Sequence, residues 1–201
     1  MYDLFAIILC YTLGSLPFSV WLCQLSGLQD PRTYGSKNPG STNVSRQNKM
    51  VSVGVLICDI SKAYIPLWAL SHNIHGESLL IPLCASAIML GHCYSLFLRG
   101  HGGKGVACAL GALSALSGPL TLAILSVWLL ALLASKRRVY IASISAASTG
   151  ILWSIITLIW PTLWPHSYAL SLTLFAVSTV ILWRHRHDFN RAHQHTGTSS
   201  S

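Results

Sequence analysis

The sequence predicts an all-α protein, a polytopic membrane helix bundle with seven transmembrane segments, two of them short. Of its 201 residues, 52% are hydrophobic and only 9% are charged, whereas a soluble domain carries about 25% charged residues. The mean hydropathy of +0.55 points the same way. Long apolar runs alternate with short polar tracts that hold most of the Lys and Arg. Such a chain cannot cover itself with a water-facing surface, so we expect an integral membrane protein.

Charge and cysteine usage argue against two other classes of protein. The net charge of +8 comes from 13 Lys and Arg against 5 acids, but the cations lie between apolar runs. That placement favours a topology signal and anionic headgroups over nucleic acid. The six cysteines lie in or at the ends of apolar runs, with no Cys-x-x-Cys pair. We therefore expect no disulfide framework, no metal site and no cofactor.

The first apolar run, residues 4–25, is long enough to form one span. It has no basic segment before it and no small-residue cleavage site, which indicates a retained span rather than a signal peptide. Pro17 lies near the middle of the run, after Gly14. Because proline removes a helical hydrogen bond, we expect a kink there.

A polar stretch, Gly35–Arg46, separates this run from the next. It holds two glycines, three serines, a threonine, two asparagines, a lysine and an arginine, and no carboxylate. Hydroxyls, amides, backbone N–H groups and a guanidinium are the donors that suit a phosphate. A merely solvated loop is the alternative, but such a loop does not require so many donors without an acid. The stretch therefore predicts a phosphate-binding site.

Two ionisable residues lie inside the second apolar run, residues 51–70. Asp59 and Lys62 are three residues apart, which places them on one face of a helix. Ionisable residues inside a span usually face the protein interior. A structural ion pair is the favoured interpretation, and a substrate contact is the alternative.

The third run, residues 79–98, leads into a glycine-rich turn with the sequence His-Gly-Gly-Lys-Gly, His101–Gly105. Glycines let backbone N–H groups approach an anion, and the following helix N-terminus and Lys104 both add positive charge. The turn is not a Walker A loop, because the required preceding glycine and following Ser or Thr are absent. His92, near the end of the run, is interpreted as a structural histidine rather than a catalytic one.

The rest of the chain is apolar except for one break and two basic tracts. Ser117–Pro119 interrupts the stretch between Lys104 and the tract Lys136–Arg138, which predicts a turn between two arms of about fifteen residues each. Two further runs, residues 140–160 and 166–183, precede a basic tail.

Cation placement fixes the expected topology. Twelve of the thirteen Lys and Arg lie in 26–50, 99–104, 135–138 and the tail, and none lies in 71–78 or 161–165. The positive-inside rule then puts the N-terminus outside and the C-terminus in the cytoplasm. A five-span bundle with a re-entrant hairpin is the alternative to seven segments. The whole chain, 1–201, is expected to form one domain, with 192–201 mobile.

In this order, these residues resemble the bacterial acyl-phosphate:glycerol-3-phosphate acyltransferases, enzymes of the inner membrane. The resemblance covers nearly the whole chain, and it implies a single transmembrane acyltransferase domain with its active site on the cytoplasmic face. The matching positions are Gly14–Phe18, Asp30, Arg32, Gly35, Ser36, Asn38, Gly40, Thr42–Val44, Arg46, Asp59, Lys62, Leu90–His92, Phe97, Leu98 and Gly102–Ala107.

Some positions depart from the family pattern. They are Lys37, Pro39, Ser41, Ser95, Gly100, His101 and Tyr140. Tyr140 replaces the first of two family serines and leaves Ser143 as the candidate. The C-terminal family motif fits in two registers: starting at Arg186 it supplies His187 and Asn190, and starting at Arg184 it supplies His185 but Asp188 in the asparagine place. The first of these is preferred.

The resemblance implies transfer of a fatty acyl group from acyl phosphate to glycerol-3-phosphate, the first step of phospholipid synthesis. Acyl phosphate is already activated, so the glycerol hydroxyl can attack directly, and either His187 or the departing phosphate takes the proton. Lys104, Ser36 and the 102–105 backbone would hold the acyl phosphate. The expected catalytic residues are Ser36, Arg46, Lys104, His187 and Asn190, and the expected substrate-binding residues are Asn38, Gly40, Thr42, Asn43, Gly102, Gly103, Gly105 and Ser143.

Two alternatives come from other classes of protein. A small transporter for phosphorylated metabolites or anions would also have a cationic interior, but such proteins often show repeated halves, and this sequence shows no internal repeat. A membrane scaffold would not need Arg46, Lys104 and His187 on one face.

Overall fold

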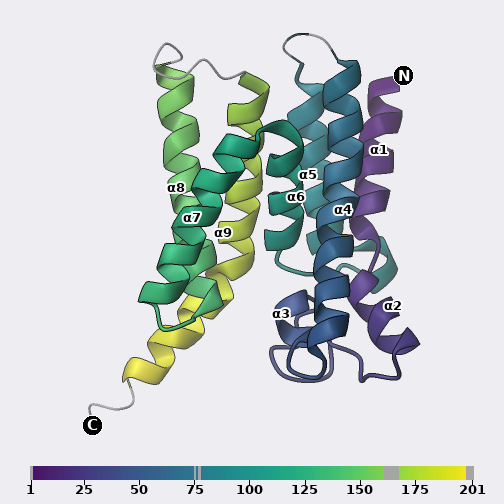
Figure 1. Cartoon of the computed structure of the whole chain (residues 1–201), viewed down its shortest axis with the longest axis vertical. Helices are drawn as coiled ribbons and strands as arrows, with labels where there is room; N and C mark the ends of the chain where they lie inside the picture. Colours follow the sequence, from purple (N-terminus) through teal and green to yellow (C-terminus); the bar gives the residue numbers. More distant parts are fainter. Residues whose placement is uncertain (1, 75, 77, 161–167, 198–201) are drawn as a thin grey trace.

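The computed structural model describes residues 2–74, 76, 78–160 and 168–197, with side chains described as far as Arg186. All of the regular structure in these ranges is helical (Figure 1). The elements are α1 (Tyr2–Ser15), α2 (Phe18–Leu25), α3 (Ser41–Val44), α4 (Lys49–Asn73), α5 (Leu80–Cys93), the 3-10 turn η1 (Leu96–Leu98), α6 (Val106–Leu116), α7 (Gly118–Ala134), α8 (Val139–Ile159) and α9 (Tyr168–Gly197).

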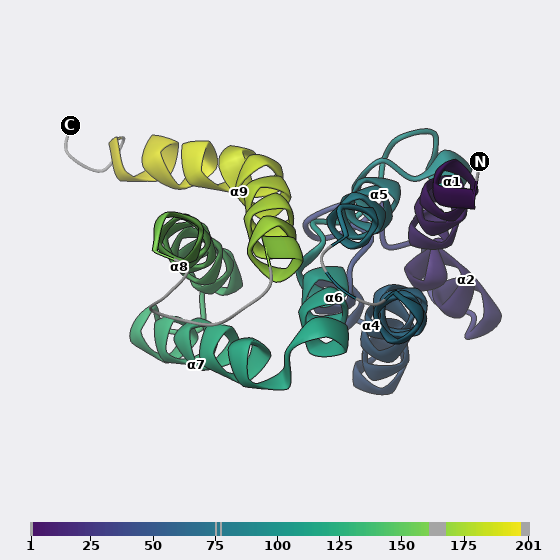
Figure 2. The same ribbon diagram turned by 90° about the horizontal axis from the view of Figure 1, so that it is seen from above.

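The long helices pack as pairs. Helix α1 contacts α5, α4 contacts α6, and α8 contacts both α7 and α9. Seen from above, α1, α4, α5 and α6 form one group and α7, α8 and α9 form the other (Figure 2). Contacts between α5 and α9 join the two groups, and fully buried side chains such as Ile88 and Leu174 belong to the core that they share.

Glycines bring the paired helices close together. A Cβ atom on Gly14 would collide with the backbone of Ile88, and one on Gly91 would collide with the backbone of Tyr11. These positions let α1 and α5 touch along their backbones, as small residues do in other membrane helix pairs.

The kink predicted at Pro17 is confirmed. Helix α1 ends at Ser15 and α2 begins at Phe18. The break exposes carbonyl groups, and two side chains from elsewhere in the chain satisfy them: Ser95 Oγ donates to Ser15 O at 2.5 Å, and Lys62 Nζ donates to Leu16 O at 3.0 Å. The break is thereby fixed to α4 and to the segment after α5.

Five helical segments are long and apolar enough to cross a membrane. They are Tyr2–Leu25, Lys49–Asn73, Leu80–Leu98, Val139–Ile159 and Tyr168–Arg186. Helices α6 and α7 are shorter, at 11 and 17 residues. The predicted break between them is confirmed: Ser117 separates the two helices, and its Oγ caps α7 by accepting from Leu120 N. The count of seven segments stays a prediction.

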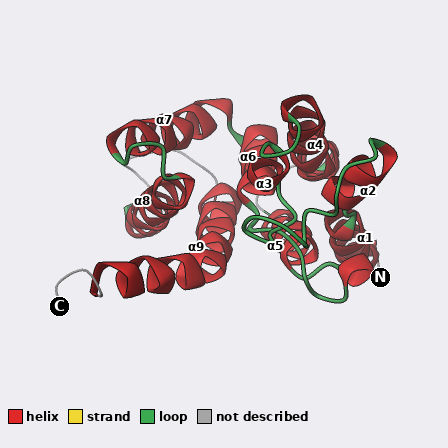
Figure 3. Ribbon diagram, turned by 90° about the horizontal axis from the view of Figure 1, so that it is seen from below, coloured by secondary structure: helices red, strands yellow, loops and turns green. Residues whose placement is uncertain are grey.

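The donor-rich segments gather toward one end of the molecule. The polar stretch with α3, the α7–α8 turn and the C-terminal part of α9 lie at the lower end in Figure 1, and Figure 3 views that end directly. Helix α9 continues to Gly197, beyond the predicted end of the last apolar run at Trp183. Arginine, histidine, alanine and glutamine all tolerate helical backbone, which explains the extension. Residues 198–201 of the expected mobile tail lie outside the described residues.

Candidate active site

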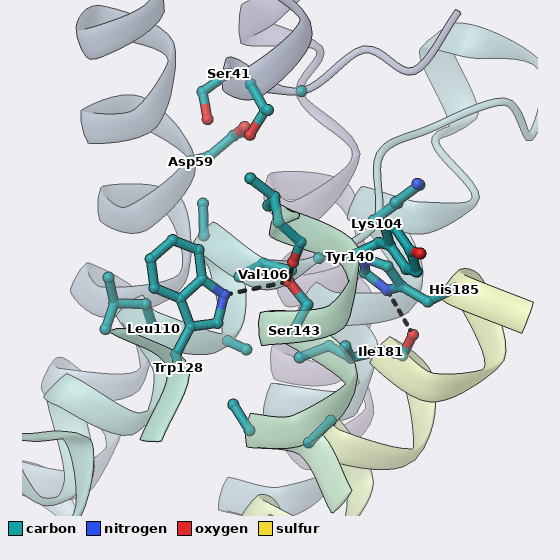
Figure 4. Close-up of a pocket in the computed structure, with 18 of the residues that line it drawn as sticks. Ser41, Asp59, Lys104, Val106, Leu110, Trp128, Tyr140, Ser143, Ile181 and His185 are labelled. Atoms are coloured by element: carbon teal, nitrogen blue, oxygen red, sulfur yellow. Dashed lines mark hydrogen bonds between the residues drawn. The ribbon is translucent and has the colours of Figure 1, made fainter. Parts of the chain in front are cut away.

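A cavity of about 470 Å³ lies between the polar stretch, the start of α6 and helices α7, α8 and α9. Figure 4 shows part of its lining. One end is polar, and the loop, the glycine-rich turn and helices α4 and α5 contribute to it. The residues of this end are Ser36, Asn38, Gly40, Ser41, Thr42, Asn43, Arg46, Asp59, His92, Lys104 and Gly105.

The rest of the cavity is largely apolar and is lined by one face of each of four helices. The lining positions on each helix recur at spacings of three or four residues, which places them on a single face. The stripe on α9 runs from His185 to Val177, a depth of about 12 Å at 1.5 Å per residue. The main lining residues are Val106, Leu110 and Leu113 on α6, Thr121, Leu125 and Trp128 on α7, Tyr140, Ser143 and Ala147 on α8, and Val177, Ile181 and His185 on α9.

Asn43 folds the polar stretch around itself. Its Nδ2 donates to Pro31 O at 2.7 Å and to Tyr34 O at 3.1 Å, and its Oδ1 accepts from Ser36 N at 3.1 Å. The residue is only 2% exposed. Gly35 has a φ of +56°, and a Cβ there would collide with the Asn43 amide. The Asn43 side chain therefore holds the loop together, and because Asn43 also lines the cavity, its binding of substrate stays a prediction.

The backbone of the glycine-rich turn is also partly occupied. Gly102 N donates to Cys93 O at 3.1 Å, and Gly103 N donates to His92 O at 3.0 Å. These two N–H groups hold the turn against the end of α5, and binding of acyl phosphate by Gly102 and Gly103 stays a prediction. Lys104 and Gly105 do line the cavity, and Gly105, with a φ of +86°, precedes the first residue of α6.

Arg184 holds the same turn from the other side. Its Nε donates to Gly103 O at 3.1 Å and a terminal nitrogen donates to Gly102 O at 2.9 Å. Its guanidinium lies 5.1 Å from the centre of the Tyr94 ring, and Trp183 Nε1 donates to Tyr94 Oη at 2.9 Å. Helix α9 is thus fixed to the turn that carries Lys104. Sequence reasoning gave Arg184 no role of its own, although its position directly after an apolar run was a signal.

His185 is the histidine of the C-terminal motif whose side chain the structure describes. His185, from the alternative register, is buried and lines the cavity (Figure 4). Its Nδ1 lies 2.9 Å from Ile181 O one turn earlier. The side chains of His187 and Asn190 lie outside the described residues. Among the described side chains, His185 of α9 and His92 of α5 are thus the histidines that line the cavity.

The predicted ion pair in α4 is confirmed. Lys62 Nζ lies 2.8 Å from Asp59 Oδ1, and both side chains are buried. His92 Nδ1 lies 3.6 Å from the same oxygen, beyond hydrogen-bond distance. Ligand atoms of Asp59, His92 and Cys108 lie within 4.8 Å of one another, as in a metal site. The Lys62 ammonium already neutralises that carboxylate, which argues against a metal ion there.

Ser143 joins two helices at the cavity wall. Its Oγ accepts from Trp128 Nε1 at 3.2 Å and donates to Val139 O at 3.0 Å (Figure 4). A hydroxyl has one proton and two lone pairs, so one acceptor position remains for a ligand. Ser143 thus lines the cavity as expected, but its proton is committed to α8.

The described residues of the polar end carry more positive than negative charge. Its one carboxylate, Asp59, is neutralised by Lys62, while Arg46 and Lys104 both line the cavity. A second carboxylate, Asp30, lies just outside the cavity and is paired with Arg32 at 2.6 Å. Hydrogen bonds from the Arg32 side chain hold the pKa of that carboxyl below its usual range. An anion entering the polar end therefore meets cations without a competing carboxylate.

The fold and the site define a polytopic membrane protein whose cavity joins a cationic, donor-rich end to an apolar interior. The chain belongs to the glycerol-3-phosphate acyltransferases, a family of enzymes, because the model of that family matches residues 4–195.

Relatives and solved structures agree with this membership. A glycerol-3-phosphate acyltransferase of Aliivibrio salmonicida is 36% identical over 189 residues, covering 94% of this chain and 92% of that protein. One from Bordetella pertussis is 37% identical, with coverage of 92% and 86%. The crystal structure of PlsY (YgiH), an integral membrane glycerol 3-phosphate acyltransferase in its glycerol 3-phosphate form, superposes with a TM-score of 0.85 at 33% identity, covering 96% of this chain and 93% of that chain. The lysophosphatidic acid form gives a TM-score of 0.83 at 32% identity.

Proposed function

We propose that this protein transfers a fatty acyl group from acyl phosphate to the primary hydroxyl of glycerol-3-phosphate, forming 1-acyl-glycerol-3-phosphate and phosphate. The observation that carries this proposal is the continuity of the cavity. Its cationic end suits two phosphate groups, and the four-helix apolar part suits an acyl chain. Family membership supports the acceptor, and the apolar depth supports a lipid-linked donor.

The reaction needs no protein nucleophile. The glycerol hydroxyl oxygen attacks the carbonyl carbon of the mixed anhydride, a new ester C–O bond forms, and the bond between that carbon and the phosphate oxygen breaks. Phosphate leaves with the electron pair of the broken bond. The proton of the attacking hydroxyl passes to a base, which is either a histidine or the departing phosphate. The protein therefore acts chiefly by positioning and by stabilising negative charge.

The polar end supplies separate groups for the two substrates. We assign Lys104 and Ser36 to the acyl phosphate, because both line the cavity where the glycine-rich turn meets the polar stretch. Thr42 lies on α3 and Arg46 follows just after it. Both are assigned to glycerol-3-phosphate, since an arginine fork binds phosphate in a bidentate manner. Asn38 and Gly40 line the same end and complete the binding surface.

His185 is the favoured histidine for the hydroxyl proton. Its Nδ1 lies 2.9 Å from Ile181 O, a geometry in which the Nδ1 proton is donated to the carbonyl and Nε2 is the basic nitrogen of the neutral ring. A basic nitrogen at the cavity wall can accept a proton from the glycerol hydroxyl. His187 and Asn190 stay candidates for glycerol-3-phosphate binding, as their position in the family motif suggests.

We further propose the orientation that the cation distribution favours. The end with α3 and the basic tracts would face the cytoplasm of a bacterial inner membrane, with the N-terminus outside and α6 and α7 as the two short segments of seven. The whole chain would then be one catalytic unit that takes soluble glycerol-3-phosphate from the cytoplasm. The orientation is tested by cysteine labelling from each side of sealed vesicles. The variants are Gly76→Cys and Lys136→Cys, and the two introduced cysteines would be labelled from opposite sides.

The first test of the activity is acyl transfer to labelled glycerol-3-phosphate by the purified protein. Palmitoyl phosphate, palmitoyl-CoA and palmitoyl-ACP are offered in parallel. Labelled lysophosphatidic acid from palmitoyl phosphate alone is the expected result. Product from the thioesters alone would overturn the donor assignment, and no product from any donor with folded protein would favour transport of phosphorylated metabolites.

The second test concerns Lys104. Lys104→Ala is expected to lower kcat by about 10²–10³, the usual effect of removing one charge-stabilising donor, while its elution from size-exclusion chromatography is unchanged. Lys136→Ala is the matched control, because it removes an exposed cation from the α7–α8 turn. Activity of Lys104→Ala equal to that of the control would contradict the site assignment.

A further inference from the structure

A second hollow, the outer groove, opens beside the reaction cavity. It has a volume of about 760 Å³ and lies between the segment 30–39, the segment 94–104 and the first turn after the apolar part of α9. Its described lining residues are Asp30, Arg32, Thr33, Ser36, Lys37, Asn38, Pro39, Tyr94, Phe97, Leu98, Arg99, Gly100, His101, Gly102, Lys104, Trp183, Arg184 and Arg186.

The groove is strongly cationic. Six of its described lining residues are Lys or Arg, and Asp30 is the one carboxylate among them. That carboxylate is paired with Arg32 at 2.6 Å, so it does not offset the other five cations. Concave surfaces lined by one sign of charge focus the field and raise the local concentration of ions of opposite sign. An anion is therefore the ligand that this groove favours.

Aromatic rings hold two of these cations in place. The Arg184 guanidinium lies 5.1 Å from the centre of the Tyr94 ring, and that of Arg186 lies 3.5 Å from the centre of the Trp183 ring. Stacking restricts a long arginine side chain, so less entropy is lost when it binds a phosphate. These two arginines are thus held against the wall of the groove by neighbouring rings, although Arg186 is itself exposed.

The outer groove and the reaction cavity share three lining residues, Ser36, Asn38 and Lys104. We call this shared edge the threshold. A ligand in the groove therefore lies next to the polar end of the cavity. Lys37, Arg99 and His101 line the groove but not the cavity, and all three are exposed. The groove thus has its own cations, separate from those assigned to the reaction.

We propose that the outer groove is a second anion site, which binds a phosphomonoester, and that its occupant is glycerol-3-phosphate before it passes the threshold into the cavity. The identity of this ligand rests on the proposed function, whereas binding of a phosphomonoester does not. A soluble ligand is favoured over a lipid because Lys37, Arg99 and His101 lie on exposed loop segments rather than on long apolar helices. Inorganic phosphate and lysophosphatidic acid share the same phosphate chemistry and serve as comparison ligands.

The structure supplies a matched control for this site. In the described part of the chain, the non-glycine residues with positive φ are Lys37, Arg99, Lys136 and Arg137, with φ values of 55°, 51°, 54° and 67°. All four are exposed cations. Lys37 and Arg99 line the outer groove, whereas Lys136 and Arg137 lie in the α7–α8 turn and do not line the groove. Replacing either pair by asparagine, which tolerates this backbone region, removes the same charge from the same kind of backbone.

The direct experiment is arginine modification by phenylglyoxal on the purified full chain, read by mass spectrometry at individual arginines. Glycerol-3-phosphate is expected to protect Arg99 and to leave the modification of Arg137 unchanged, with weaker protection by inorganic phosphate. Equal protection of both arginines, or none at Arg99, would overturn the site. Protection by lysophosphatidic acid in nanodiscs but not by glycerol-3-phosphate would overturn the assignment of a soluble ligand.

The kinetic experiment compares the two asparagine pairs. Lys37→Asn/Arg99→Asn is expected to raise the KM for glycerol-3-phosphate about three- to tenfold at low salt, with kcat and the KM for palmitoyl phosphate unchanged, and the effect is expected to shrink as salt screens the field. Lys136→Asn/Arg137→Asn is expected to behave as wild type. Equal KM changes in both pairs would contradict the proposal. Protection of Arg99 in a protein without acyltransferase activity would refute the proposed function and leave the anion site standing.

Discussion

Replacing Lys62 by methionine is expected to destabilise the protein strongly. Its ammonium lies 2.8 Å from Asp59 Oδ1 and 3.0 Å from Leu16 O, and the side chains of the ion pair are 3% and 5% exposed. Removing one partner of a buried ion pair costs about 3–5 kcal/mol, because the other charge stays buried without compensation. The Leu16 carbonyl at the Pro17 break also loses its donor, so we expect a cost at the upper end of this range.

A thermal assay can measure this cost. In a chain of this size, 1 kcal/mol shifts the Tm by about 2–4 °C, so Lys62→Met is expected to lower the Tm by about 6–20 °C. Tryptophan fluorescence of the detergent-solubilised protein reports unfolding. The control is Asp59→Leu/Lys62→Met, which removes both charges and is expected to cost less than Lys62→Met alone, since apolar replacement of a whole buried pair is often close to neutral.

The double variant also separates a structural role from a substrate contact. If the pair is structural, the KM values of the double variant stay near those of wild type at temperatures where it is folded. A double variant destabilised by the sum of the two single changes would refute the reasoning, because the two charges would then act independently. A large rise in KM without loss of stability would instead indicate that Asp59 contacts substrate from the cavity wall.

Three further predictions follow from the site. Asn43→Ala removes three hydrogen bonds of the polar stretch, including the one from Ser36 N, each of which contributes about 1 kcal/mol to stability. The variant should lose activity, and residues 26–50 should become sensitive to limited proteolysis. Resistance to proteolysis equal to that of wild type would contradict the assigned role. His185→Ala and His185→Gln should both lower kcat about 10²–10⁴-fold if the ring accepts a proton, whereas near wild-type activity of the glutamine variant would leave only a hydrogen-bonding role. Pairing with Arg32 lowers the pKa of the Asp30 carboxyl, so the pair stabilises the fold above the unfolded pKa of about 3.9, and this stability is lost as pH falls through the folded pKa. Arg32→Gln should therefore lower the free energy of unfolding by about 0.2–1 kcal/mol at pH 7 and leave it unchanged in strong acid. Measuring Tm against pH for both proteins checks this.

The sequence determined the class of fold because hydrophobicity and backbone restriction are local properties. The predicted run of residues 51–70 lies inside α4, and that of residues 140–160 matches α8 to within a residue at each end. Pro17 and Ser117 end helices where their chemistry requires it. The cavity residues Ser36, Arg46 and Lys104 were also visible in the sequence, because a dense set of donors without an acid is unusual between apolar runs.

Only the tertiary structure decided which of those donors are already engaged. Asn43 and the N–H groups of Gly102 and Gly103 looked suited to a phosphate, yet each bonds to carbonyls that folding brings alongside. Arg184 reaches Gly103 across 81 residues of sequence, and the next residue, His185, lines the cavity. A hydrogen-bonding group has a fixed capacity, and its partner is set by proximity in space. Sequence therefore shows which chemistry is present, and packing decides how much of it is left for a ligand.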